Sequence, residues 1–282
     1  MHEARAQHIV EWYDVCEANL RKWWDLDQSL AIHAGFWDES TKTLREALQR
    51  ENEVLAAIAG IRPSDHVLDA GCGVGGSAIF LGERIGCRVT GITLSEKQVA
   101  TATRKASERQ PKQPPVFMRR DFHDTGFPGA TFDVVWAIES VCHAHDKSRF
   151  VREAYRLLKP GGRLIVADGF QVHDTYPPSA QRLLDRAMHN WAVDALESIA
   201  NFESHLERAG FKEIRKEDAT HYVRPSSRRL FFYSFPAIPL SKLGEWFGWS
   251  SKLQTGDFVG YHYQYRALRK QLCRYLIFRA EK

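Results

Sequence analysis

A carboxylate and a glycine-rich turn stand together at residues 69–76, which read Asp-Ala-Gly-Cys-Gly-Val-Gly-Gly. Glycines let the backbone approach a ligand closely, and a helix that starts here would offer its N-terminal N–H groups. Gly71, Gly73 and Gly76 also satisfy the GxGxxG pattern of dinucleotide sites. Asp69, however, would repel a pyrophosphate and would stabilise an ammonium or a sulfonium. The turn therefore favours a ligand that carries positive charge.

Two common nucleotide sites do not fit the sequence. A nicotinamide site needs an acidic residue about 20 positions after the first glycine to bind the ribose. Position 91 is a glycine, and the next carboxylate is Glu96. A phosphate-binding P-loop needs GK[ST] after its glycines, and that motif is missing. NAD is therefore disfavoured, and the P-loop interpretation fails.

A second set of reactive side chains follows the apolar run 132–138, in the segment Glu139-Ser140-Val141-Cys142-His143. Either Glu139 or His143 could accept a proton from a reacting group, so we take both as catalytic candidates. The alternatives are that Glu139 only contacts a cofactor and that His143 only binds backbone in a loop. His145 and Asp146 lack a third ligand nearby, so we predict no metal site.

The elements that must position these residues alternate between strand-like and helix-like segments. A helix is expected from about residue 74, and Ser95 should cap the next helix with Gln98 at the capping-box position. We predict an α/β, Rossmann-like fold with a seven-stranded, mostly parallel sheet, helices on both faces and a helical lid. The expected strands are 66–70, 88–93, 116–121, 132–140, 162–170, 213–220 and 273–282.

Three stretches fall outside this alternation and are assigned to a lid over the C-terminal edge of the sheet, where open α/β sheets bind ligands. Much of the chain's aromatic content lies in them, which suits lining an apolar cavity and suits packing equally well. The expected divisions are an N-terminal helical lid at 1–55, a core at 56–170, an inserted helical pair at 171–200, core again at 201–221, an aromatic-rich helical insertion at 222–270 and a final strand at 271–282.

Five ordered segments between residues 67 and 168 resemble the class I S-adenosylmethionine-dependent methyltransferases. They are VLDAGCGVGGSAIFL, GITLSEKQ, RRDFHDTGF, FDVVWAIESVCHA and LLKPGGRLIVAD. Within that family, GITLS, the Glu-Ser and His of residues 139–143, and HAGFWDE resemble a branch that holds tocopherol, sterol, sarcosine/dimethylglycine and cyclopropane-fatty-acid-type methyltransferases.

The resemblance implies a set of cofactor-binding residues. Asp69, Gly71 and Gly73 would contact the amino-acid end of S-adenosylmethionine, and Asp121 with Phe122 would frame the adenine. The usual acidic ribose clamp is missing, so its role would pass to Thr93, Leu94 and Gln98. Phe122 could instead belong to the core, and Gln98 could serve only its helix cap. Two further contacts are expected from Ile138 and Trp37.

The implied activity is transfer of the methyl group of S-adenosylmethionine, by in-line displacement, to a small hydrophobic acceptor at O, N or C. Such an enzyme mainly aligns the reactants and excludes water. A prenylated quinol or phenol, a sterol or terpenoid, or a secondary metabolite would suit as acceptor, and His189, Trp191 and Tyr261 are expected to contact it.

Three alternatives stay open for the function. A methylammonium acceptor could bind by cation–π attraction. An isoprenyl diphosphate could bind to lid arginines, namely Arg182, Arg186, Arg228 and Arg229. A non-catalytic subunit that only binds the cofactor is the third alternative.

Composition limits the other classes of protein. The 282 residues carry 39 Lys and Arg against 35 Asp and Glu, and a net charge of +4 is too weak to indicate nucleic-acid binding. Five widely spaced cysteines without a CxxC pair indicate reduced thiols. Because no apolar run is long enough to span a bilayer or to form a signal core, we expect a cytoplasmic protein without stable membrane insertion. A homo-oligomer remains possible.

Overall fold

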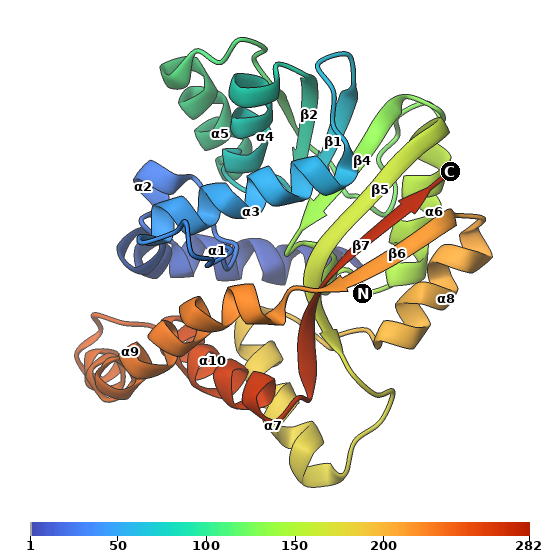
Figure 1. Ribbon diagram of the computed structural model, residues 1–282. Helices are drawn as coiled ribbons and strands as arrows, with labels where there is room; N and C mark the ends of the chain where they lie inside the picture. The colour runs from blue at the N-terminus through green and yellow to red at the C-terminus, as the bar shows by residue number, and fades with distance from the viewer. Residues whose placement is uncertain (1) are drawn as a thin grey trace.

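A seven-stranded sheet forms the centre of the computed structural model, which describes residues 2–282 (Figure 1). The strand order is β3-β2-β1-β4-β5-β7-β6; β1 to β5 pair in parallel, and β7 pairs antiparallel with β5 and β6. The predicted fold class is therefore confirmed. The strands are β1 His66–Ala70, β2 Arg88–Thr93, β3 Val116–Arg119, β4 Phe132–Ile138, β5 Leu158–Gln171, β6 Lys212–Asp218 and β7 Cys273–Glu281.

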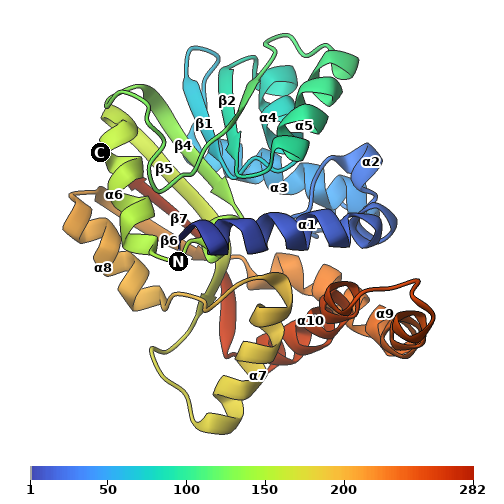
Figure 2. The same cartoon turned by 180° about the vertical axis from the view of Figure 1, so that it is seen from behind.

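Helices cover both faces of this sheet, because successive strand side chains point to opposite sides. Val67 of β1 packs with α3, α4 and α5, whereas Leu68 packs with α6 and α8. In Figure 1 α3 lies across the near face, and in Figure 2 α6 lies on the face turned to the viewer. These helices are α3 Leu44–Ala59, α4 Gly76–Phe80, α5 Glu96–Arg109, α6 Lys147–Leu157 and α8 Ile199–Ala209.

A second group of helices lies beyond the carboxyl ends of the parallel strands (Figure 1). These lid helices are α1 His2–Trp24, α2 Leu26–Ser29, α7 Pro178–Met188, α9 Thr220–Phe247 and α10 Lys252–Arg269. Within residues 2–282, no helix is both long and apolar enough to cross a membrane.

Some elements differ from their expected bounds. α3 runs across the expected division at residues 55 and 56, because Leu55 and Ala59 belong to the core beneath the sheet. The expected helical pair at 171–200 is one helix, α7, followed by the 3-10 turn His189–Trp191, which ends where Ala192 turns left-handed at φ 54°. The helix after the glycine turn begins at Gly76, and a π-helix, Leu81–Ile85, follows it.

The ends of β1 and β4 approach each other closely at the glycine turn. Gly71 has φ 103°, and a Cβ atom at this position would lie 2.3 Å from Ser140 Cβ. Ser140 Oγ donates a hydrogen bond to the Ala70 carbonyl oxygen at 2.7 Å. The predicted strand 132–140 ends at Ile138, since Glu139 has a left-handed backbone with φ 45°. Glycine at position 71 is therefore required by backbone conformation and by space.

The Gly71→Ala variant should lose about 3 kcal/mol of stability, because it combines a steric clash with a strained backbone. Gly60→Ala is the matched control, since Gly60 also has positive φ, at 59°, but a Cβ there meets nothing within 4 Å. The control should lose about 1 kcal/mol. Urea unfolding followed by tryptophan fluorescence measures both; equal losses would mean that the contact with Ser140 is unimportant.

Candidate active site

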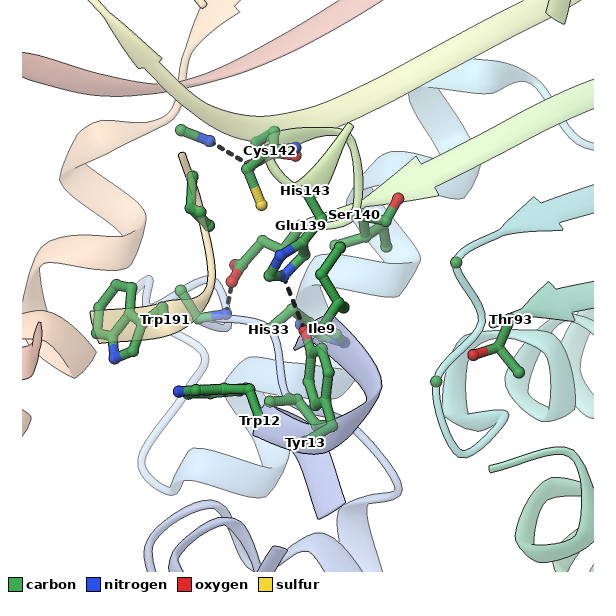
Figure 3. Close-up of a pocket in the computed structure, with 18 of the residues that line it drawn as sticks. Ile9, Trp12, Tyr13, His33, Thr93, Glu139, Ser140, Cys142, His143 and Trp191 are labelled. Carbon is green, nitrogen blue, oxygen red and sulfur yellow. Dashed lines mark hydrogen bonds between the residues drawn. The ribbon is translucent and has the colours of Figure 1, made fainter. Parts of the chain in front are cut away.

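A cavity of about 270 Å³ lies between the carboxyl ends of the parallel strands and the lid helices. Figure 3 shows side chains from α1, from the segment after β4 and from the turn after α7 pointing into it, with Thr93 of β2 at the far side. Most of its lining is apolar or aromatic, including Ile9, Trp12, Leu230 and Met188. The cavity thus joins a polar sheet edge to an apolar lid.

Most of the predicted site residues meet in this cavity. Its lining includes Asp69, Gly71, Gly73, Thr93, Leu94, Gln98, Asp121, Phe122, Ile138, Glu139, His143, Trp191 and Tyr261. Trp37 and His189 do not line it. The Trp37 indole N–H donates to Ser226 Oγ at 2.7 Å, and His189 Nδ1 lies 2.9 Å from the carbonyl oxygen of Asp185 one turn earlier. Trp37 is therefore held by α9, and His189 by the preceding turn of α7.

Asp69 is the buried acid at the glycine turn. It is 3% exposed, and its Oδ2 has no hydrogen-bond partner among the described residues. Burial raises its pKa to about 7, although a hydrogen bond from the Ala78 backbone acts in the opposite direction. A positive charge beside this carboxyl group would restore its ionised form and supply the missing partner.

The β2 side of the cavity is held by short polar contacts. Ser95 caps α5 by accepting a hydrogen bond from the Gln98 backbone N–H at 3.2 Å, as predicted. The Gln98 side chain does not complete a capping box; its Oε1 accepts from Thr93 Oγ1 at 2.5 Å. The contact keeps both side chains at the cavity wall.

The next wall residues lie after β3. Asp121 Oδ1 accepts a hydrogen bond from the His123 backbone N–H at 2.8 Å and lies 2.7 Å from His123 Nδ1. Phe122 packs edge-on against Phe150, with ring centroids 5.3 Å apart. Phe122 thus belongs partly to the core and also lines the cavity.

His143 pairs with Tyr13 of α1 across the cavity. The Tyr13 hydroxyl oxygen lies 3.0 Å from His143 Nε2, and His143 Nδ1 lies 3.3 Å from the Ala192 carbonyl oxygen (Figure 3). A carbonyl can only accept, so Nδ1 carries the proton and the Tyr13 hydroxyl donates to Nε2. Burial lowers the pKa of His143 to about 4 and raises that of Tyr13 above its usual range. Both groups are therefore neutral at pH 7.

Two carboxyl groups, of the buried Glu51 and the partly buried Glu139, hold the segment that connects the lid to α3. Glu51 is fully buried and accepts hydrogen bonds from the Gly35 N–H at 2.8 Å and the Tyr275 hydroxyl at 2.6 Å. Its Oε2 lies 2.6 Å from His33 Nδ1. Glu139 Oε1 accepts from the Ala34 N–H at 2.6 Å, and burial, together with the charge of Glu51, raises the pKa of Glu139 well above its usual range. Much of the hydrogen-bonding capacity of both groups is used to hold backbone.

Asp257 of α10 is a buried acid in the lid wall of the cavity. It is 0% exposed, its Oδ2 accepts from Asn19 Nδ2 at 3.1 Å and from the Tyr261 hydroxyl at 2.9 Å, and its Oδ1 has no partner among the described residues. Burial raises its pKa to about 7. The lid therefore presents a hydrogen-bonding group in an otherwise apolar wall.

Sequence reasoning missed Tyr13, Glu51 and Asp257. Each forms a hydrogen bond with a partner that is far away in the sequence. Tyr13 is 130 residues from its partner His143, and Asp257 is 238 residues from its partner Asn19. The one local signal was a single acid among the aromatics of residues 255–265. Within residues 2–282, no cluster of three or more His, Cys, Asp or Glu is arranged to hold a metal ion.

Comparison with known proteins identifies relatives over most of the chain. A family model described as a methyltransferase domain matches residues 68–166. The 27-O-demethylrifamycin SV methyltransferase of Amycolatopsis mediterranei is 37% identical over 195 residues, which cover 69% of this chain and 71% of the relative. Methyltransferase GfsG of Streptomyces halstedii is 30% identical over 261 residues, which cover 91% of each protein.

A solved structure shares the whole architecture. The cyclopropane synthase MmaA2 from Mycobacterium tuberculosis superposes with a TM-score of 0.82 and covers 98% of each chain at 18% identity. This likeness shows the fold alone, and it includes the lid helices because nearly all of the chain is covered.

The Asp257→Asn variant should change how stability depends on pH. Folding raises the pKa of Asp257 from 3.8 to about 7, so its contribution to stability is lost as the pH rises through that range. Asparagine cannot ionise, so the variant should gain up to about 2 kcal/mol relative to the parent protein between about pH 5 and about pH 8. Thermal melts at the two pH values measure this, with exposed Asp174→Asn as the control. A pH-independent difference would refute the assignment.

Proposed function

The chain belongs to the class I S-adenosylmethionine-dependent methyltransferases, and we propose that its acceptor is a hydroxyl group on a hydrophobic small molecule, with His143 as the general base. It is an enzyme that takes its methyl group from S-adenosylmethionine and transfers it to a small molecule. The observation that carries the proposal is a neutral, partly buried His143–Tyr13 pair in a mainly apolar cavity that also contains the glycine turn.

The glycine turn fits the methionine end of the cofactor. Gly71 is required by its close approach to Ser140, whereas a Cβ at Gly73 would meet nothing within 4 Å, so the backbone at Gly73 is open to a ligand. The unpartnered Oδ2 of Asp69 supplies a buried negative group for the positive charge of the ligand. We therefore assign Asp69, Gly71 and Gly73 to this end.

The remaining cofactor contacts follow the sheet edge. Thr93 and Gln98 are joined by a hydrogen bond beside Leu94, and we assign the three residues to the ribose. Asp121 and Phe122 offer a carboxylate and an aromatic ring for the adenine, and Ile138 adds an apolar contact. When bound, S-adenosylmethionine supplies an electrophilic methyl group on a sulfonium. Trp37 lies outside the lining, so we do not include it in this set.

His143 and Tyr13 together can take the proton that an acceptor hydroxyl must lose. With Nδ1 protonated against Ala192, the lone pair of Nε2 faces the Tyr13 hydroxyl. The hydroxyl of the acceptor donates a hydrogen bond to Tyr13 Oη, and the Tyr13 hydroxyl donates to His143 Nε2. When the acceptor loses its proton to Tyr13, Tyr13 passes its own proton to His143 Nε2. Tyr13 itself stays protonated because its pKa is raised. Glu139, which binds the Ala34 N–H, is assigned to positioning the cavity floor.

The cavity lining favours an acceptor that is largely apolar. Trp191 and Tyr261 form an aromatic corner with ring centroids 5.6 Å apart, and they line the lid wall together with Trp12 and Trp24. His189 lies outside this corner. The arginines considered for a diphosphate, Arg182, Arg186, Arg228 and Arg229, are absent from the lining, and Arg186 donates to the Tyr263 hydroxyl instead. A diphosphate acceptor would therefore lack its expected partners.

Transfer of an isotopically labelled methyl group tests the acceptor class. We expect the label to enter a phytylated hydroquinone, whereas dimethylglycine and geranyl diphosphate remain unlabelled. Extraction followed by mass spectrometry of each product measures the transfer, after calorimetry has verified that the protein binds S-adenosylhomocysteine. Labelling of dimethylglycine or geranyl diphosphate alone would refute the proposal. Cofactor binding without any transfer would favour the non-catalytic alternative.

The His143→Ala variant should lower kcat by about 10²- to 10⁴-fold, because it removes the base. Its affinity for S-adenosylhomocysteine should stay within about threefold of the parent value. Tyr13→Phe should lower kcat less, since water can replace its hydroxyl. The pKa of His143, lowered to about 4, predicts a parent rate that does not fall as the pH drops through the usual histidine range and falls only near pH 4. Full activity in His143→Ala would remove His143 from the reaction.

A further inference from the structure

The outer face of α9 exposes aromatic side chains to solvent. Nine large apolar side chains are exposed among residues 4–282, and eight of them lie between residues 232 and 249. Trp246 and Trp249 are 82% and 80% exposed, at the turn that leads into α10. They flank Phe247, whose ring lies 5.4 Å from Trp246 and 5.1 Å from Trp249 between centroids. Contiguous exposed apolar surface of this kind marks an interaction site.

The same helix buries a face made mainly of small and polar side chains. The residues buried along this inner face, mostly three or four positions apart, are Thr220, Val223, Ser226, Ser227, Leu230, Ser234, Ala237, Ser241 and Gly244. Ser241 Oγ lies 2.7 Å from Ser250 Oγ and 2.8 Å from Thr255 Oγ1. The Ser241 hydroxyl on the buried face is thus hydrogen-bonded within the protein. A surface helix normally buries its large apolar side chains, whereas α9 leaves most of its own from residue 232 onward exposed to solvent. The outer face of α9 therefore requires an apolar partner.

The charge around this face is strongly positive. Residues 219–256 contain five Arg and Lys residues and a single acid, Glu245. Arg224, Arg228, Lys242 and Lys252 are exposed, and the first three project from the same side of α9 as the aromatic residues by helical spacing. A partner that is both apolar and negatively charged matches this surface.

We propose that the outer face of α9 and the turn after it dock on the surface of an anionic lipid bilayer. Lipid headgroups and acyl chains provide negative charge and apolar volume together, and tryptophan favours the boundary between them. A second copy of this chain fits less well, because a symmetric contact through this face would bring two positive surfaces together. The protein would lie on the bilayer without crossing it.

Docking would place the bilayer against a helix that also forms part of the cavity wall. The first part of α9 supplies Val223, Ser226 and Leu230 to the cavity wall, and the exposed side chains of residues 232–249 lie on the rest of the same helix and on the turn after it. This inference goes beyond the proposed acceptor and does not depend on it, because vesicle binding can be measured without any methyl transfer.

The full-length protein should bind vesicles of phosphatidylcholine mixed with phosphatidylglycerol and should bind pure phosphatidylcholine vesicles much more weakly. Co-sedimentation measures binding, and a blue shift of tryptophan emission reports burial of Trp246 and Trp249. Binding should weaken as salt is raised. Failure to bind either kind of vesicle, or equal binding to both, would overturn the proposal.

The Trp246→Ser/Trp249→Ser double variant should bind mixed vesicles at least about tenfold more weakly, since it removes two large apolar anchors. Lys242→Glu should weaken binding through charge alone. Val116→Ser is the matched control, because Val116 is 53% exposed on β3, outside the 232–249 segment, and this variant should bind like the parent protein. Unchanged S-adenosylhomocysteine affinity would show that each variant is folded. A lipid-free dimer that the double variant dissociates would overturn the lipid proposal and assign the face to a second copy.

Discussion

Two carboxyl groups under the lid, Glu51 and Glu139, hold the backbone of residues 34 and 35 against the sheet. Buried acids are costly unless they are hydrogen-bonded, and here the N–H groups of the connecting segment supply those bonds. The segment joins α1 and α2 to α3, so this contact fixes the lid relative to the core. Leu30 is held in the same region, where its carbonyl oxygen lies so close to Gly76 that no side chain fits there. The shape of the cavity depends on this attachment.

The cavity combines two electrostatic environments that serve one reaction. At the sheet edge, Asp69, whose Oδ2 has no hydrogen-bond partner among the described residues, matches a cationic ligand. Where the segment after β4 meets the lid, burial keeps His143 neutral, and a histidine that is neutral can accept a proton. Desolvation acts on both groups, raising the pKa of the acid and lowering that of the base. The lid therefore shapes the cavity and also sets the charge state of the groups inside it.

The alternating strands and helices of the core could be predicted from the sequence, because the apolar runs and the glycine turn are local signals. Asp69, Gly71 and Thr93 lie at the ends of strands, and strand ends in a parallel sheet meet at one edge. The lid was harder to predict, since its contacts join residues far apart and its helices break local rules. α9 continues through Pro225, Pro236 and Pro239, which would ordinarily end a helix. Trp37 illustrates the same limit, because its indole N–H binds Ser226 of α9, which lies 189 residues away in the sequence, and Trp37 itself does not line the cavity.

The lid is assembled from segments that are far apart in the sequence. Asn19 of α1 contacts Asp257 of α10, and β7, which completes the sheet between β5 and β6, follows α10 in the chain. During synthesis, the strands from β1 to β5 leave the ribosome well before α9, α10 and β7. A nascent chain can therefore pair its first five strands while the cavity still lacks a wall and β5 still has an open edge. Completing the cavity and protecting the sheet edge therefore both depend on elements that are synthesised after the first five strands.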